Sequence, residues 1–248
     1  MPRAAKPGRF DRYLEETQGP WLSLVFVLPL AVLYETANRG LLGPVQAGPG
    51  EQLVAFSLLR RAFDAANATG AMLPALTLVA CLLGWHIAQR RTWAIRPHYL
   101  AAMTVEATLL ALPALAAAVL LARGLPWSAA TLEIPVTRLA TLAIGAAVYE
   151  ELIFRLLGFT LIHGLCVDVL GLNRRAGAIT TVFTTAALFA AYHYLGCESF
   201  QWPSFVFRTA AGVFLGALFA LRGFGITVGC HAAYDLLWVM LVSKHLAI

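Results

Sequence analysis

Charged residues are scarce in this chain of 248 residues: Asp, Glu, Lys and Arg together make up 12%. A soluble domain carries roughly 25% charged residues, so this composition disfavours a soluble enzyme or binding domain. The apolar residues Ala, Val, Ile, Leu, Met, Phe, Trp, Tyr and Cys together make up 60% of the chain, and the mean hydropathy is +0.74. These values predict an all-α, polytopic transmembrane helical bundle.

Cysteine is also rare, with four residues at positions 81, 166, 197 and 230 and no C-x-x-C pair. Cys81, Cys166 and Cys230 lie in apolar runs, where a free cysteine packs as a small hydrophobe. Cys197 lies in a predicted loop without an obvious partner. The cysteines therefore do not indicate a redox compartment.

Long-period repeats and low-complexity linkers are absent, so residues 1–248 are predicted to form a single integral-membrane domain. The glycine-rich segment 223–229 has the wrong spacing for a dinucleotide-binding loop, and a tight turn between helices is expected there. The formal charge of +5 is carried mostly by arginines beside apolar runs. This placement indicates a lipid bilayer as the partner and excludes a nucleic-acid surface.

About seven apolar segments are long enough to be transmembrane spans. They are residues 21–34, 71–88, 101–122, 137–165, 178–195, 205–221 and 226–246. Residues 1–20 are predicted as a cytoplasmic tail, and residues 51–64 as a helix at the membrane interface or in a solvated loop. In this arrangement ten Lys and Arg residues lie on the N-terminal side and six on the other. The bias predicts a cytoplasmic N-terminus.

Three ionisable residues, Glu150, Glu151 and Arg155, interrupt the fourth apolar segment. Charges in such a run are costly unless they are paired or used. On a helix Glu151 and Arg155 are four residues apart and can pair, whereas Glu150 is turned away by about 100° and has no partner in its own helix. The pattern predicts one carboxylate held by an arginine and one available for chemistry.

Two later spans carry further polar residues: His193, and the pair His231 and Asp235, which share a helix face. If they converge with Glu150, the set can catalyse hydrolysis. Glu150 would be the general base, His193 would hold or activate the water, and His231 would donate to an oxyanion. No cofactor is required. Glu150, His193 and His231 could also bind a divalent metal such as zinc, but the H-E-x-x-H motif is absent and a metal is not indicated.

These motifs carry a resemblance to a known family. Glu-Glu-x-x-x-Arg at 150–155, Phe-x-x-x-His at 189–193 and His-x-x-x-Asp at 231–235 follow one another on successive late spans. In this order they resemble the CAAX-protease and bacteriocin-processing (CPBP or ABI) family, which includes type II CAAX prenyl endopeptidases. The resemblance covers a core at residues 137–248.

The resemblance implies an intramembrane endopeptidase. Glu150 would act with His193 on a water, Glu151 and Arg155 would support the site, and His231 with residue 235 would stabilise the oxyanion. The family admits Asn or Asp at the last position; Asp235 can donate only when protonated, or else it orients His231. The family has been described both as metalloproteases and as glutamate-dependent proteases, and both mechanisms stay open here.

The predicted substrate is a membrane-anchored protein or peptide that undergoes C-terminal processing, sorting-tag removal or maturation. The alanine- and arginine-rich composition indicates a prokaryotic cytoplasmic membrane. A catalytically silent scaffold or a bacteriocin self-immunity protein would have the same fold. A proton-coupled transporter would also bury such residues but would usually show a repeat relating its halves. Arg208 and Glu198 are interpreted as solvated or snorkelling residues near span ends.

Overall fold

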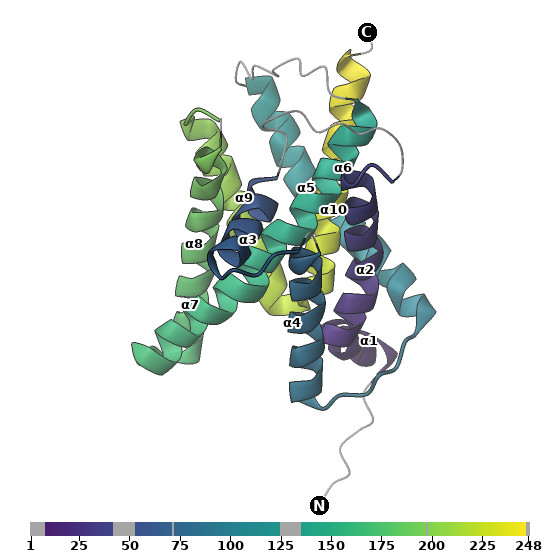
Figure 1. Cartoon of the computed structure of the whole chain (residues 1–248), viewed down its shortest axis with the longest axis vertical. Helices are drawn as coiled ribbons and strands as arrows, with labels where there is room; N and C mark the ends of the chain where they lie inside the picture. The colour runs from purple at the N-terminus through teal and green to yellow at the C-terminus, as the bar shows by residue number, and fades with distance from the viewer. Residues whose placement is uncertain (1–7, 42–52, 71, 125–134, 197, 247–248) are drawn as a thin grey trace, which may run out of the picture.

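The computed structural model describes residues 8–41, 53–70, 72–124, 135–196 and 198–246, and every regular element within them is helical, as predicted (Figure 1). Cys197 and part of the predicted 51–64 helix lie outside these residues. In chain order the elements are α1 (Arg9–Thr17), α2 (Pro20–Asn38), α3 (Val54–Ala65), α4 (Leu73–Gln89), α5 (Pro97–Gly124), α6 (Val136–Glu151), η1 (Leu152–Phe159), α7 (Thr160–Gly164), η2 (Leu165–Val169), α8 (Arg174–Tyr192), η3 (His193–Leu195), α9 (Trp202–Arg222) and α10 (Phe224–Leu246).

Within the described residues six helices are long and apolar enough to cross a membrane, counting Val136–Val169 as one helix of 34 residues. They correspond to six of the seven predicted spans. The remaining one, α4, is apolar but has 17 residues, fewer than the roughly 20 that a straight span requires. The expected class of a polytopic helical bundle is therefore confirmed, with α4 at the short limit.

Helix α10 is central, because it packs against α2, α5, α6 and α9 (Figure 1). Its first seven residues, 224–230, are almost all apolar and are buried on all sides, and Phe224, Ile226 and Val228 are fully buried. A helix that is apolar all round is expected where neighbours surround it. The arrangement places His231, which follows this stretch, inside the bundle and not against lipid.

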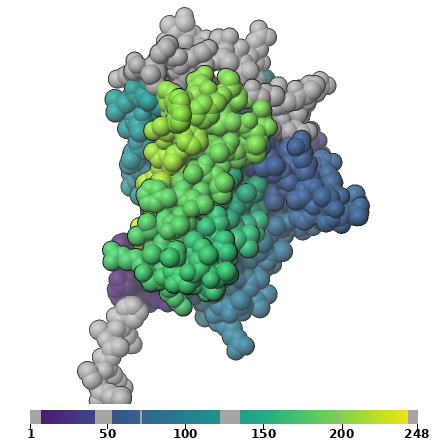
Figure 2. All heavy atoms as spheres, turned by 90° about the vertical axis from the view of Figure 1, so that its left-hand side faces the viewer, coloured from purple at the N-terminus to yellow at the C-terminus, as the bar shows by residue number. Residues whose placement is uncertain are grey.

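Helix α6 changes its hydrogen-bonding pattern at the glutamate pair. Glu151 is its last α-helical residue, and η1 continues the same rod as a π-helix from Leu152 to Phe159. Because π-helical turns bond residue i to i+5, they reorient the side chains that follow, and they are frequent at functional sites. Beyond η1 the rod runs through α7 and η2 to Val169 and lies beside α8 on the face shown in Figure 2.

Helices α8 and α9 approach closely at Gly212, which with Gly216 forms a Gly-x-x-x-Gly pattern of the kind that lets helices pack closely. A Cβ atom at Gly212 would lie 2.9 Å from the Cα of Ala186. The turn expected in the glycine-rich segment is also present, but it consists of Gly223 alone, with a φ of 79° between α9 and α10. Gly225 and Gly229 lie inside α10, where they allow close packing against Ser23 and Phe26.

The segment predicted as a tail contains α1, which is fastened to the bundle. The hydroxyl of Tyr13 donates to Glu106 on α5, and Arg222 at the end of α9 pairs with the same carboxylate at 2.6 Å. Burial, together with the hydrogen bond to Glu106, raises the pKa of Tyr13, so the phenol keeps its proton. Within residues 1–20, α1 is therefore a helix bonded to the bundle, and the cytoplasmic location of this segment stays a prediction.

Candidate active site

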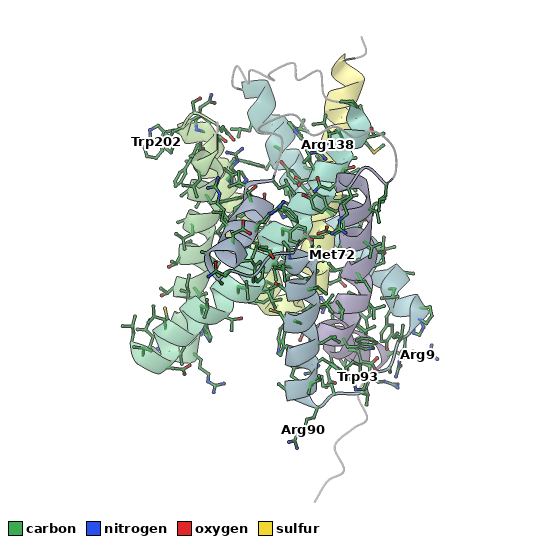
Figure 3. The ribbon with its side chains drawn as sticks, viewed as in Figure 1. Arg9, Met72, Arg90, Trp93, Arg138 and Trp202 are labelled. Atoms are coloured by element: carbon green, nitrogen blue, oxygen red, sulfur yellow. The ribbon has the colours of Figure 1, made fainter. Side chains whose placement is uncertain are left out.

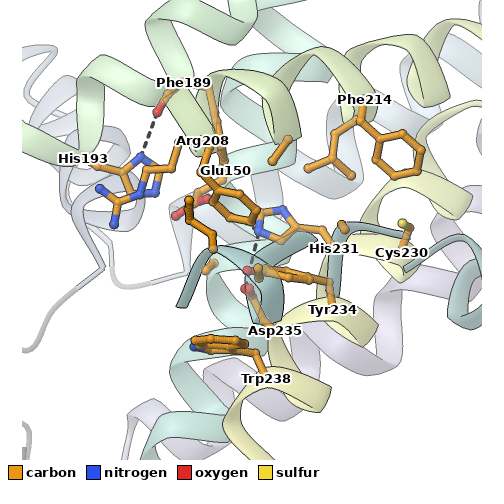
Figure 4. A pocket seen from close by; sticks show the side chains of 17 residues that line it. Glu150, Phe189, His193, Arg208, Phe214, Cys230, His231, Tyr234, Asp235 and Trp238 are labelled. Atoms are coloured by element: carbon orange, nitrogen blue, oxygen red, sulfur yellow. Dashed lines mark hydrogen bonds and ion pairs between the residues drawn. The ribbon is translucent and has the colours of Figure 1, made fainter. Parts of the chain in front are cut away.

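The six site residues predicted from the sequence come together from three helical rods. Glu150 and Glu151 end α6, Arg155 lies in η1, His193 opens η3 directly after α8, and His231 and Asp235 are on α10. Glu150, His193, His231 and Asp235 line one cavity of about 270 Å³ (Figure 4). Glu151 and Arg155 lie behind this cavity and are fully buried. The structure thus brings all six predicted site residues together, and the catalytic role of each one stays a prediction.

Arg155 connects its own rod to α8 and α9. Its Nε lies 3.2 Å from Oε2 of Glu151, so the predicted pairing within the helix is present. Its Nη2 donates to the carbonyl oxygen of Gly212 on α9 at 3.1 Å, and its guanidinium lies over the ring of Phe189 on α8. A buried charge is tolerated when it is paired and hydrogen-bonded in this way. Arg155 therefore acts as a fixed support for Glu151.

Glu151, held by Arg155, in turn orients the ring of His231. Its second oxygen, Oε1, accepts a hydrogen bond of 2.8 Å from Nδ1 of His231. The opposite ring nitrogen, Nε2, lies 3.4 Å from Oδ2 of Asp235 and 3.8 Å from Oε2 of Glu150. Both ring nitrogens thus face carboxylate oxygens, an arrangement that suits an imidazolium with two N–H donors. The ring is oriented with one N–H directed into the cavity.

Glu150 has a partner that the sequence reasoning missed. The hydroxyl of Tyr192, the last residue of α8, donates to Oε1 of Glu150. This partner comes from another helix, so the prediction that Glu150 has none within its own helix is unaffected. A buried tyrosine hydroxyl normally finds such an acceptor. The only sequence signal was the position of Tyr192 directly before His193 in the second motif. Because this bond uses Oε1, the other oxygen of Glu150, Oε2, remains available on the cavity side.

His193 is oriented by its own helix. Its Nδ1 lies 2.8 Å from the carbonyl oxygen of Phe189 (Figure 4). A carbonyl oxygen can only accept, so Nδ1 carries the proton and Nε2 of the neutral ring keeps its lone pair. A lone pair on a cavity-lining imidazole can accept a proton or hydrogen bond from water. His193 is therefore suited to positioning a water beside Glu150.

Arg208 belongs to the same cavity, which corrects its interpretation as a snorkelling residue. It lies in the second turn of α9 and lines the cavity together with His193 and Asp235. Its two terminal nitrogens donate to the two oxygens of Glu198 at 2.8 and 2.9 Å. Glu198, expected to be merely solvated, is thus paired with a residue that lines the cavity, although it does not line the cavity itself. The sequence could not show this, because Arg208 is outside the three motifs.

The donor set does not fit a metal ion. Within the described residues no group of three or more His, Cys, Asp and Glu side chains is arranged to hold one. Both nitrogens of His231 face carboxylates, and one oxygen of Glu150 accepts from Tyr192, so few lone pairs converge. A set of Glu150, His193 and His231 would have to rearrange to ligate a divalent ion.

The fold and the site define a polytopic integral membrane protein with carboxylates and imidazoles around an internal cavity. Residues 132–237 match the family described as Type II CAAX prenyl endopeptidase Rce1-like, which confirms the resemblance that the three motifs indicate. The match covers less than half of the chain but contains all six predicted site residues. The family is one of proteases, which supports a peptidase. No curated protein and no solved structure matches the chain.

Proposed function

We propose that this protein is an intramembrane endopeptidase that hydrolyses a peptide bond of a membrane-anchored protein or peptide. The observation that supports it most is the shared cavity of Glu150, His193 and His231, in which each side chain is oriented by a hydrogen bond to a different partner: Tyr192, the carbonyl oxygen of Phe189, and Glu151. Preorganised groups of this kind lower the barrier to hydrolysis because they need no rearrangement during the reaction.

In the proposed mechanism a water lies between Oε2 of Glu150 and Nε2 of His193. Glu150 takes a proton from the water while the water oxygen bonds to the peptide carbonyl carbon. The N–H on Nε2 of His231, which faces the cavity, donates to the oxyanion, while Glu151 keeps the ring in place through Nδ1. Asp235, 3.4 Å from the same Nε2, stabilises the positive charge of the ring. The C–N bond then breaks, and the proton on Glu150 passes to the departing amine.

The setting is proposed to be a prokaryotic cytoplasmic membrane with the N-terminus in the cytoplasm. C-terminal processing, removal of a sorting tag and peptide maturation all place the scissile bond near a membrane anchor. A cavity whose apolar walls include Phe207, Phe214 and Leu215 suits such a substrate. A catalytically silent scaffold stands as the alternative, and the same experiment separates the two.

The test is cleavage of membrane-anchored peptides by the purified full-length protein in lipid, with and without a chelator. Glu150→Gln keeps the side-chain shape but loses the base, so we expect a fall in kcat of roughly a hundredfold or more. Glu16→Gln, at the distant pair with Arg96, is the matched control and should cleave like the wild type. Chelator should have no effect.

Two results would contradict the proposal. Wild-type rates for Glu150→Gln would remove the assigned base, and loss of activity in chelator would establish a metal-dependent reaction. Absence of cleavage by the wild type across lipidated and tag-bearing peptides would favour the scaffold.

A further inference from the structure

The cavity has an uneven charge distribution. Of the described residues that line it, Arg208 is the only Lys or Arg. It lies beside His193, whereas Phe214 and Cys230 lie on the other side of His231 (Figure 4). Ala114, Ala118 and Leu215 add to the apolar part of the lining. A ligand that fills the cavity therefore meets a guanidinium near the catalytic imidazoles and apolar walls farther away.

From this we propose that Arg208 is a specificity-determining residue that binds a carboxylate of the substrate, and that Glu198 occupies this binding position in the free protein. The inference rests on the proposed peptidase function. The carboxylate can come from a free C-terminus or from an acidic side chain near the cut bond. Both sources present the same planar pair of oxygens to the guanidinium.

The geometry of the Arg208–Glu198 pair is that of carboxylate recognition. Two parallel N–H donors reach two oxygens at 2.8 and 2.9 Å, the bidentate form that a guanidinium provides and an ammonium cannot. Tyr194 lies under the guanidinium at 5.7 Å and keeps a favourable contact if Glu198 leaves. The donor fork therefore stays in place during an exchange of carboxylates.

Glu198 is suited to being displaced. Its side chain is 43% exposed, against 21% for Arg208, so the acidic partner is the outer member of the pair. Ion pairs in contact with water contribute little net stability, because solvent screens them and the side chains lose freedom. A ligand carboxylate that enters from the cavity can replace Glu198, which then returns to solvent. Glu198 therefore competes with the substrate carboxylate for Arg208, in addition to stabilising the connection between α8 and α9.

The experiment compares three otherwise identical membrane-anchored peptides: one with a free C-terminal carboxyl group, one with a C-terminal amide, and an amide with Glu in place of Gln beside the cut. For wild type, kcat/KM for one of the two carboxylate peptides should exceed that for the plain amide, which also identifies the source. In Arg208→Gln this preference should fall by roughly tenfold, the scale of a lost charge-assisted contact. In Glu198→Gln the preference should rise, because the competing carboxylate is gone.

A charge swap, Arg208→Glu with Glu198→Arg, separates recognition from structure. It keeps an ion pair at the rim but places the acidic group on the cavity side. A purely structural pair predicts recovery of wild-type kinetics on all peptides, and this result would overturn the proposal. Carboxylate recognition predicts that the preference stays lost.

Binding to the Glu150→Gln protein gives a readout that is independent of cleavage. Its Kd should be lower for the preferred carboxylate peptide than for the amide, and adding Arg208→Gln should make the two equal. Equal Kd values before that change would also overturn the proposal. If the wild type cleaves nothing but the difference in Kd persists, the peptidase function fails while carboxylate binding by Arg208 stands.

Discussion

Arg155 and Tyr192 do not line the cavity, yet they determine how its reactive groups are held. Arg155 fixes Glu151, and Glu151 fixes the ring of His231. Tyr192 takes one oxygen of Glu150 and so determines which oxygen remains for a water. The site therefore has two sets of supporting contacts: Arg155 and Glu151 hold the oxyanion donor His231, and Tyr192 holds the base Glu150. The first was predictable in part from the i, i+4 spacing; the second was not.

Tyr192→Phe is expected to lower kcat by roughly tenfold to a hundredfold with little change in KM, because a hydrogen bond to a charged group contributes about 1.5–3 kcal/mol. The ring and its packing against Phe154 remain. The control is Tyr99→Phe at the far end of the bundle, where the hydroxyl contacts Arg96. Unchanged kcat in Tyr192→Phe would show that the hydroxyl does not position the base.

The positions of the site residues depend most on the close packing of α8 against α9. Gly212 lets the two backbones approach, and its carbonyl oxygen accepts the hydrogen bond from Arg155. Any separation of these helices would therefore loosen Arg155 and, through Glu151, the ring of His231. Close approach also brings His193 at the end of α8 and Arg208 near the start of α9 to one cavity.

Gly212→Ala and Gly216→Ala form a matched pair for this contact. Both gain the same helix propensity, but the nearest atom to the new Cβ is the backbone Cα of Ala186 at 2.9 Å in the first and a side-chain atom of Val182 at 3.4 Å in the second. Overpacking should make Gly212→Ala less stable than Gly216→Ala by about 1–3 kcal/mol. Thermal unfolding in lipid or detergent measures the difference; equal Tm values would contradict the close contact.

The whole molecule has two different ends. Arg9, Arg90 and Trp93 lie at one end of the bundle and Trp202 at the other (Figure 3). Tryptophans at both ends are typical of the two membrane interfaces, and an excess of arginine marks the cytoplasmic one. His193 follows the last residue of α8 and lies shortly before Trp202, which begins α9, so the cavity lies nearer the end opposite Arg90. With the N-terminus in the cytoplasm, the site would act in the outer half of the membrane.

This orientation can be measured with single cysteines in a chain whose four native cysteines are replaced by alanine. Cysteine at exposed position 90 should react with a membrane-impermeant thiol reagent only after the cells are opened, because in the proposed orientation this position faces the cytoplasm. Cysteine at exposed position 202 should react in intact cells. The reverse pattern would place the site on the cytoplasmic side and contradict the charge-based orientation.

Composition and local spacing determined the class of fold, six long spans, and the pairing of Glu151 with Arg155, because hydropathy and helical periodicity act within one segment. They also indicated which polar residues would gather, since ionised side chains in apolar helices must find one another. Tertiary structure alone decided that Tyr192 bonds Glu150, that Glu151 holds His231, and that Arg208 faces the cavity and not lipid. These contacts join distant parts of the chain, and they depend on how each helix is rotated against its neighbours, which local sequence does not specify.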